Sequence, residues 1–346
     1  MKTLIKQVAG IDVAQKELVV TLGRMYIDTD VELYAYKTFS NDQKGFASLQ
    51  EWVKKQSDLT IPFHYVMEAT GVYHEKLAYH LSDHGAIVSI VLPNKISNYA
   101  RTLDVRTVTD KSASQAICKF GLERKLDEWQ RPSKVFRDLR SLTRERDQLI
   151  AERTVLKNQL HAEQSEAFPS AQGILRLNQR LELLDKQEKQ IQSEVAAYVK
   201  QDKQLQASLL LLTSIPGIGK LTAIIILAET NGFELIRNKK QLVNYAGLDV
   251  KEKQSGTTVK GKPKISKRGN RHLRKSLYMP SLAAIRTDER FKTFFARLVS
   301  RHGIKLKAGV AVQKKLLELT YIVWKTQKPY DKNYLQQQII IKELGQ

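Results

Sequence analysis

Four residues of this chain carry side chains that could do chemistry: three carboxylates and one hydroxyl. Asp12 lies in VAGIDVAQKELVV, Glu68 in HYVMEATGVYH and Asp110 in VRTVTDKSAS. Ser255 lies far downstream in KEKQSGTTVKGKPK, the most basic stretch of the chain. Carboxylates at the ends of apolar strands are costly to crowd together unless a hard divalent cation neutralises them, so the set predicts a Mg²⁺ site. Mg²⁺ beside so much positive charge indicates phosphodiester chemistry.

The three carboxylates meet the needs of a two-metal site. In such a site acidic side chains hold two Mg²⁺ ions about 4 Å apart, one activating the attacking oxygen and one stabilising the leaving oxygen. Asp12, Glu68 and Asp110 would supply three ligands. The alternative is that each is only a turn or cap residue. Their occurrence in GIDVA, MEATG and TDK, in that order, favours the metal site.

The composition indicates a globular protein with a polyanionic partner. The 346 residues include 57 Lys and Arg against 36 Asp and Glu, a formal net charge of +21. This excess favours nucleic acid through counterion release. An anionic membrane would instead call for a basic amphipathic helix or a spanning segment, and the longest strongly apolar run, 222–228, is too short to cross a bilayer.

Targeting signals and cysteine content predict a cytoplasmic protein. The start, MKTLIKQVAGIDV, lacks a continuous apolar region followed by a small-residue cleavage site, so we expect no secretory signal. Cys118 is the only cysteine, which excludes an intrachain disulfide and a Cys-cluster zinc site. The seven histidines form no HExxH pattern, so a zinc hydrolase is not indicated.

The N-terminal part predicts an α/β domain over residues 1–132. Two β-rich runs within 5–22, joined by the polar DVAQKE, predict a hairpin with Asp12 at the end of its first strand. Further strands are expected at 64–68 and 86–92, with a helix between them. Strand, helix and strand in this order place the active edge of the sheet at the strand ends.

Asp110 belongs to the next helix of this domain. Thr109 before it is a good N-cap, so Asp110 should lie in the first turn of a helix that runs to Gly121.

The middle of the chain predicts a coiled-coil linker over 133–207. Five leucines recur at the spacing of a coiled-coil seam amid abundant Arg, Glu and Gln: Leu139, Leu142, Leu149, Leu156 and Leu160. The segment 168–173 should break this helix, and a second amphipathic helix follows. The two helices would form an antiparallel hairpin or pack against another copy of the protein.

The remainder, 208–346, predicts a helical domain that begins with a phosphate-binding turn. In SIPGIGKLTA, a tight turn with Gly217 and Gly219 would expose backbone N–H groups at a helix start, where Lys220 adds a charge. This pattern is typical of a helix-hairpin-helix, which positions nucleic acid without reading its sequence. The alternative is a simple corner between two helices, with the glycines needed only for geometry.

A basic loop follows this turn. Between residues 251 and 275 ten cations face one acid, and three interleaved glycines indicate close backbone approach. The alternative is a charged loop that is only solvated. The residues that we expect to contact nucleic acid here are Lys251, Lys253, Lys260, Lys262, Lys264, Lys267, Arg268, Arg271 and Arg274.

Ser255 lies within this loop. A serine hydroxyl is a poor nucleophile until a base or metal activates it and the developing charge is stabilised, which nearby lysines could do. Composition by itself does not distinguish a catalytic serine from an ordinary loop serine.

The motifs taken together resemble a known family in order and spacing. GIDVAQKEL, YVMEATGVYH, IVLPNKISNYA, TDK, SIPGIGKLTA, YAGLDVKEKQSG and LRKSLYMPSLAA are similar to insertion-sequence transposases, relatives of the pilin-gene invertase. This resemblance implies a RuvC-like (RNase H-like) N-terminal domain and a C-terminal transposase domain with a serine. It also implies a recombinase guided by a bridge RNA that the element encodes.

The resemblance assigns roles to the four residues. It implies that Asp12, Glu68 and Asp110 hold Mg²⁺ and that Ser255, preceded by Gln254 where glutamate is usual, is the nucleophile. The product would be a covalent phosphoserine, which conserves the bond energy for rejoining. Because carboxylates and serine lie in different domains, the site could be composite, and the family implies a tetramer built from two dimers.

One position departs from the family pattern. The fourth carboxylate is expected three residues after the third, where this chain has Ala113. A second metal would then be completed by water and substrate phosphate, or by Ser112 or Ser114. Two other functions stay open: a metal-dependent junction resolvase or nuclease that uses water, and a catalytically silent RNA–DNA scaffold. The target sequence is not written in the protein if base pairing with a guide RNA specifies it.

Overall fold

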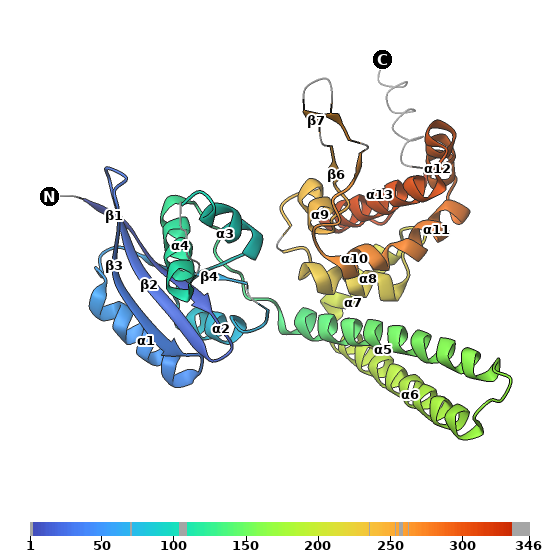
Figure 1. The fold of residues 1–346 in the computed structure, drawn as a ribbon. Coiled ribbons are helices and arrows are strands. Elements are labelled where there is room, and N and C mark those ends of the chain that lie inside the picture. The colour runs from blue at the N-terminus through green and yellow to red at the C-terminus, as the bar shows by residue number, and fades with distance from the viewer. Residues whose placement is uncertain are drawn as a thin grey trace, which may run out of the picture. The chain divides into compact units, whose positions relative to one another are not determined.

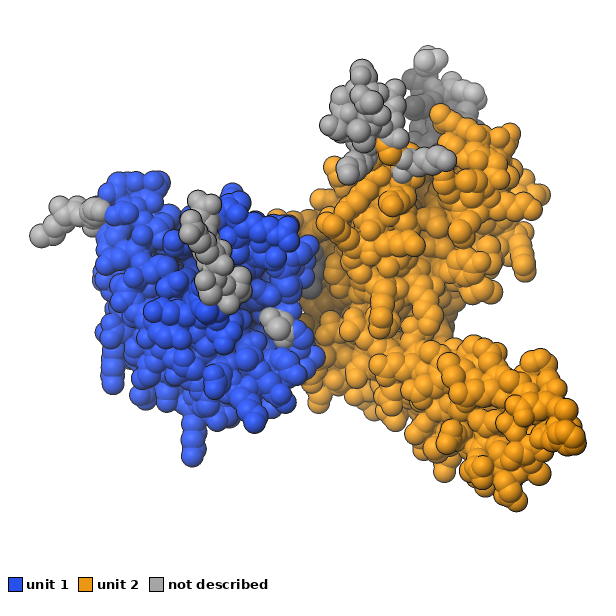
Figure 2. All heavy atoms as spheres, viewed as in Figure 1, with its two compact units in different colours: residues 1–131 blue, residues 132–346 orange. Residues whose placement is uncertain are grey.

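The computed structural model describes residues 3–69, 71–103, 109–234, 236–252, 254–255, 259–261 and 263–333. The chain divides into two compact units, residues 1–131 and 132–346 (Figures 1 and 2). The first unit is mixed α/β and the second is helical. Within the described residues, every helix is too short or too polar to cross a bilayer.

The first unit is built on a five-stranded mixed sheet with the order β3-β2-β1-β4-β5. The first three strands are antiparallel neighbours, whereas β4 runs parallel to β1 and β5 runs parallel to β4. The predicted hairpin and both later strands are therefore confirmed. The strands are β1 (Leu4–Val13), β2 (Glu17–Tyr26), β3 (Val31–Ser40), β4 (Phe63–Glu68) and β5 (Ile87–Val91).

Helices cover both faces of this sheet, because alternate residues of the central strands are apolar on each side. Ile11 and Met67 pack in one buried cluster with residues of α1 (Gln43–Gln56) and α2 (Glu75–Asp83). Val8 and Val66 pack in a second cluster with residues of α3 (Pro93–Ala100) and α4 (Asp110–Glu123). The two clusters therefore lie on opposite faces of the sheet, which we call the α1/α2 face and the α4 face.

The second unit begins with an antiparallel helical hairpin, α5 (Lys134–Gln164) and α6 (Ala171–Gln201) (Figure 1). The predicted break at 168–173 is partly wrong, because α6 already starts at Ala171. Its N-cap is Ser170, whose hydroxyl accepts a hydrogen bond from the Gly173 amide.

The apolar seam of α5 serves more than the hairpin. Leu139 is fully buried in the main helical core, and Leu142 and Leu149 pack against that core. In the described part of the second unit, the first half of α5 thus belongs to the main apolar core, and a separate coiled-coil linker over 133–207 stays a prediction.

In the second unit, α8 lies in the main core with its residues from Ala223 to Thr230 nearly all buried, and it contacts α5, α7 and α10. Two short strand pairs, β6 with β9 and β7 with β8, lie between α9 and α10. The helices are α7 (Lys203–Thr213), α8 (Lys220–Thr230), α9 (Lys239–Tyr245), α10 (Arg271–Ser276), α11 (Tyr278–Thr287), α12 (Glu289–His302) and α13 (Lys305–Thr326).

Candidate active site

Asp12 lies near the carboxyl end of β1 and on the α4 face of the sheet. Successive side chains of a strand point to opposite faces, so Asp12 shares a face with Val8 and Gly10. Val8 packs against Ile117 and Cys118 of α4 in the buried cluster on this face. The Asp12 side chain itself is half buried.

Gly10 allows α4 to approach β1 closely. A Cβ atom at Gly10 would lie 2.2 Å from the backbone nitrogen of Cys118 and 2.4 Å from the carbonyl oxygen of Ser114. A side chain at this position would therefore push the helix away from the strand. The contact seats α4 directly over the strand that carries Asp12.

Asp110 lies in the first turn of α4, as predicted. Thr109 is the N-cap, and its hydroxyl accepts a hydrogen bond from the Ser112 amide. Burial raises the pKa of the Asp12 carboxyl, and the negative charge of Asp110 raises it further. The two carboxylates are therefore close enough to repel each other.

Glu68 ends the neighbouring strand on the same face. In the parallel β1–β4 pair, Ile11 lies opposite Met67, so Asp12 and Glu68 are the next residues along the two strands. Val66, two residues before Glu68, packs in the cluster under α4. Glu68 therefore belongs to the α4 face, at the carboxyl ends of parallel strands where open α/β sheets place their sites.

This arrangement suits a divalent cation without yet being a complete metal site. Among the described residues, no three His, Cys, Asp or Glu side chains stand close enough together to hold an ion. The residues nevertheless fit one, because burial and the charge of Asp110 both raise the pKa of Asp12, and a bound cation would relieve this cost.

The structure also describes the position of the missing fourth carboxylate. Ala113 is half buried, one turn after Asp110 on α4. The Ser114 side chain is unsuited to replace the carboxylate as a metal ligand, because it is fully buried. Its hydroxyl is hydrogen-bonded to that of Thr21 at 2.7 Å. Ser112 is committed to the helix cap, where its hydroxyl accepts from the Thr109 amide at 2.8 Å. Water and substrate oxygens remain as possible ligands at this position.

Ser255 lies on a β-hairpin of the second unit, within what we call the serine segment (residues 246–269). The stem pairs β6 (Val250–Lys251) with β9 (Lys264–Ile265). Beyond the stem, β7 (Gln254–Ser255) pairs with β8 (Val259–Lys260), and Ser255 lies opposite Val259. The Ser255 side chain is outside the described part of the structure.

The turn between α7 and α8 uses its two glycines differently. Gly217 has φ +84°, and a Cβ there would lie 2.3 Å from the carbonyl oxygen of Pro280 in α11, so this glycine is required by packing. Gly219 is the N-cap of α8, and a Cβ there would meet nothing within 4 Å. Lys220 is exposed beside it. The start of α8 is thus open, which a phosphate contact would require.

The predicted basic surface is only partly described. Lys251, Lys264, Lys267, Arg268 and Arg271 are exposed. Only the backbone of Lys260 is described, and Lys253 and Lys262 lie outside the described residues.

Arg274 has a structural contact. Its Nη1 atom donates a hydrogen bond to the carbonyl oxygen of Ala246 at 2.7 Å, and the side chain is half buried. We therefore expect Arg274 to contribute less to nucleic-acid binding than the exposed cations.

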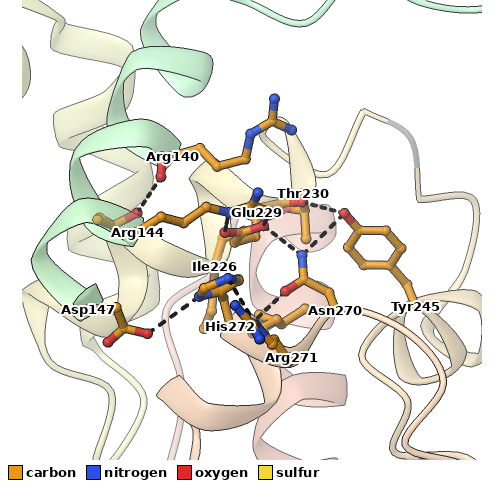
Figure 3. A network of polar contacts seen from close by, with 12 residues as sticks. Arg140, Arg144, Asp147, Ile226, Glu229, Thr230, Tyr245, Asn270, Arg271 and His272 are labelled. Atoms are coloured by element: carbon orange, nitrogen blue, oxygen red, sulfur yellow. Dashed lines mark hydrogen bonds and ion pairs between the residues drawn. The ribbon is translucent and has the colours of Figure 1, made fainter. Parts of the chain in front are cut away.

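A polar cluster around Glu229 was not predicted from the sequence. Glu229 lies on α8, and its side chain has an exposed fraction of 0%. Arg144 of α5 donates two hydrogen bonds of 2.7 Å to its carboxylate, and Asn270 donates a third of 2.6 Å (Figure 3). The available signal was a single acid, Glu229, within the apolar stretch 215–230.

Burial would raise the pKa of the Glu229 carboxyl, but the hydrogen bonds from Arg144 and Asn270 outweigh it and lower the pKa. Glu229 therefore stays ionised at neutral pH.

Comparisons with known proteins identify the family. A transposase model of the IS110 DEDD type matches residues 9–169, and the model "Transposase IS116/IS110/IS902 family" matches residues 209–296. The pilin gene-inverting protein of Moraxella bovis is 31% identical over 300 residues, covering 85% of this chain and 90% of that protein. The transposase for insertion sequence element IS1111A of Coxiella burnetii is 24% identical over 280 residues, covering 71% and 73%.

Among solved structures, RuvC of T. thermophilus in complex with a Holliday junction substrate matches 36% of this chain and 99% of that chain. The identity is 10% and the TM-score 0.27, a likeness that carries no conclusion about the site.

Fold and relatives together define a DNA transposase or recombinase with a mixed α/β first unit and a helical second unit. The chain belongs to the IS116/IS110/IS902 transposase family, which confirms the family resemblance of its motifs. Membership of this family implies a divalent metal ion.

Proposed function

We propose that this transposase cuts and rejoins DNA through a covalent phosphoserine on Ser255, with Mg²⁺ held by Asp12, Glu68 and Asp110. The observation that carries the proposal is the placement of Asp12 and Glu68 at the neighbouring carboxyl ends of β1 and β4 on the α4 face, with Asp110 in the first turn of α4, where its charge raises the pKa of Asp12. The mixed sheet of the first unit supports a RuvC-like (RNase H-like) domain. Bound Mg²⁺ would neutralise the scissile phosphate and the charge that develops on it.

The serine step forms one bond and breaks one. The Ser255 oxygen attacks the phosphorus of a DNA phosphodiester, and the P–O bond to the leaving deoxyribose oxygen breaks. The serine proton passes to a base, and the leaving oxygen is protonated. Because a phosphodiester is retained as the phosphoserine link, a new DNA end can attack it and rejoin without an external energy source.

Binding would rest on the basic surface of the second unit. Net charge of +21, the exposed lysines and arginines of the serine segment and the open start of α8 all favour contacts with phosphates. We propose that the α7–α8 turn is a helix-hairpin-helix and that a bridge RNA encoded by the element specifies the DNA target. We propose that the protein acts in the cytoplasm, where it would meet both partners.

A composite site would require several copies of the chain. We propose a tetramer formed as a dimer of dimers, in which one copy supplies the carboxylates and another supplies Ser255. The α5–α6 hairpin supports association, because apolar side chains along it are exposed: Val155 by 55%, Leu175 by 51% and Leu183 by 54%.

The second candidate is a resolvase-like nuclease in which water, activated at the carboxylates, attacks the phosphate. The arrangement of Asp12, Glu68 and Asp110 serves both reactions equally well. The two differ in product, because water leaves cut DNA with no protein attached.

The test is the covalent product itself. The substrate is an end-labelled duplex spanning the junction of the element with its flanking DNA, supplied with the transcript of the flanking noncoding region and Mg²⁺. Ser255→Ala should abolish the labelled protein on a denaturing gel and leave the gel shift of the duplex unchanged. Ser276→Ala, a matched change on α10, should leave both the adduct and the gel shift unchanged. Cut DNA without adduct in the wild type would establish the nuclease, and an adduct that persists in Ser255→Ala would remove Ser255 from the mechanism.

A further inference from the structure

The two ends of the serine segment are joined at their base. The Asn270 amide donates a hydrogen bond to the carbonyl oxygen of Tyr245 at 2.7 Å, and the Lys267 amide donates to the carbonyl oxygen of Gly247 at 3.1 Å. The Arg274 guanidinium donates a third hydrogen bond at this base, to the carbonyl oxygen of Ala246. Tyr245 and Asn270 are therefore fixed neighbours, although the whole serine segment separates them in sequence.

Glycines make this close approach possible. A Cβ at Gly269, which has φ +137°, would lie 2.3 Å from the carbonyl oxygen of Tyr245. A Cβ at Gly247, which has φ +66°, would lie 2.7 Å from Nη1 of Arg274. The base of the segment is a tightly specified junction that larger residues would open.

The two residues that flank the segment, Tyr245 and Asn270, also bind the same residue of α8, Glu229. The Tyr245 hydroxyl donates to the Glu229 carbonyl oxygen at 2.9 Å, and the Asn270 side chain donates to the Glu229 carboxylate at 2.6 Å (Figure 3). Arg144 completes the carboxylate from α5. We call Arg144, Glu229, Tyr245 and Asn270 the Glu229 cluster.

The cluster is connected to α10 and α5 at more than one point. The Asn270 side chain also caps α10, because its carbonyl oxygen accepts from the Leu273 amide at 3.0 Å. One turn beyond Arg144, Asp147 of α5 pairs with His272 at 3.4 Å and with Lys275 at 3.0 Å. The helix that follows the serine segment is thereby held to α5 as well as to α8.

Packing does not explain why a carboxylate occupies this buried position. An apolar side chain of similar volume would fill the space without the desolvation that an ionised Glu229 undergoes, and such replacements often stabilise a protein. What the carboxylate adds is direction, because two donors from α5 and one from the end of the serine segment converge on two fixed oxygens.

We propose that the Glu229 cluster is a positioning device that fixes the orientation in which the serine segment presents Ser255. This inference rests on the proposed function of Ser255 as nucleophile. Its members act through the serine segment and do not themselves touch the reacting phosphate. Misplacement of a reacting group by about 1 Å can reduce a rate by about 100-fold, so a loosened base would slow attack without weakening DNA binding.

The experiment measures binding and chemistry separately. Adduct formation is followed in a single turnover at saturating junction duplex, with the flanking transcript and Mg²⁺ present, and the Kd for the duplex is measured by gel shift. Glu229→Gln should slow adduct formation by about 10- to 100-fold and change Kd by less than about 2-fold. Tyr245→Phe, which removes one hydroxyl and leaves the buried ion pair intact, should slow it by about 3- to 10-fold.

Two comparisons test whether these residues act as one device. Arg140→Ala removes an arginine one turn earlier on α5, outside the cluster, and should leave the rate unchanged. The double variant Glu229→Gln/Tyr245→Phe should form the adduct at a rate within about 2-fold of that of Glu229→Gln alone. The effects of substitutions within one network are not additive.

Each outcome has a defined meaning. If Ser255→Ala abolishes the adduct while Tyr245→Phe and any folded Glu229→Gln protein form it at the wild-type rate, the positioning inference is overturned and the proposed function stands. A rise in Kd with an unchanged rate at saturation also overturns it. If Ser255→Ala itself keeps the adduct, the proposed function has failed instead.

Discussion

Asp12 in the first unit and Glu229 in the second are both carboxylates withdrawn from water, yet their pKa values shift in opposite directions. The pKa of Asp12 is raised by burial and by the negative charge of Asp110. Burial acts to raise the pKa of Glu229, but hydrogen bonds from Arg144 and Asn270 outweigh burial and lower this pKa. The comparison separates two uses of a buried acid. One with a built-in cation holds protein parts together, whereas one crowded by another acid is suited to recruit a cation from solution.

The largest effect is expected from Asp12→Asn, which should reduce divalent-dependent DNA cleavage by about 1,000-fold, or about 4 kcal/mol of barrier. Stability should move the other way. Because the pKa of Asp12 is raised in the fold, the stability that its protonated form contributes is present below the unfolded pKa and is lost as pH rises through the folded pKa. At neutral pH and without divalent ions, Asp12→Asn should therefore equal or exceed the wild-type Tm.

Thermal unfolding with and without Mg²⁺ tests the expected effect of Asp12→Asn on stability. Mg²⁺ should raise the Tm of the wild type and not that of Asp12→Asn. Asp58→Asn is the control in the same unit, because hydrogen bonds from Thr60 lower the pKa of Asp58. It should keep the response to Mg²⁺. A lower metal-free Tm for Asp12→Asn would contradict the comparison.

Gly10→Ala should come next, at about 3 kcal/mol of lost stability, because the added methyl group would overlap the backbone of α4 at Cys118 and Ser114. Separation of α4 from β1 would also increase the distance between the carboxylates of Asp110 and Asp12. Gly309→Ala in α13 is the matched control, since a Cβ there meets nothing within 4 Å. It should stabilise the protein by about 0.5–1 kcal/mol in urea unfolding. Equal effects of the two substitutions would refute the close α4–β1 contact.

Glu229→Gln should cost about 2 kcal/mol at pH 7, because it leaves the Arg144 guanidinium without its carboxylate. The pKa of Glu229 is lowered in the fold, so its stabilisation is present above the unfolded pKa and is lost as pH falls through the folded pKa. Urea unfolding of both proteins from pH 7 downward should therefore show the difference shrinking in acid. A difference that stays constant with pH would mean that charge is not what Glu229 contributes.

Lys220→Ala should give the smallest effect, a several-fold loss of DNA affinity with a salt-dependence slope smaller by about 1. The other residue at the start of α8, Gly219, offers a second test, because Gly219→Ala adds a methyl group only to open space. It should reduce affinity without changing the Tm by more than a few degrees. If neither substitution affects binding, the α7–α8 turn is only a corner between helices.

Local signals in the sequence were sufficient to assign each acid of the first unit to its strand or helix. Strand ends identified Asp12 and Glu68, and the N-cap Thr109 located Asp110, because alternation and capping act over a few residues. Their shared face required the parallel register of β1 and β4, which no local pattern specifies.

The Glu229 cluster was beyond sequence reasoning for the same physical reason. Arg144 is 85 residues from Glu229 and Asn270 is 41 residues away, so only the packing of α5, α8 and α10 brings them together. Similarly, the heptad spacing of the leucines correctly predicted a helix here. It could not reveal that Leu139 packs in the main core of the second unit.

The most direct test of the proposed mechanism is to locate the phosphate on the protein. Trypsin should release residues 254–260 as the seven-residue peptide QSGTTVK, in which Ser255 is the only serine. After the trapped protein–DNA adduct is digested with nuclease and trypsin, fragment-ion mass spectrometry should assign the remaining nucleotide to Ser255. Assignment to either threonine of that peptide, or to a peptide elsewhere in the chain, would contradict the mechanism.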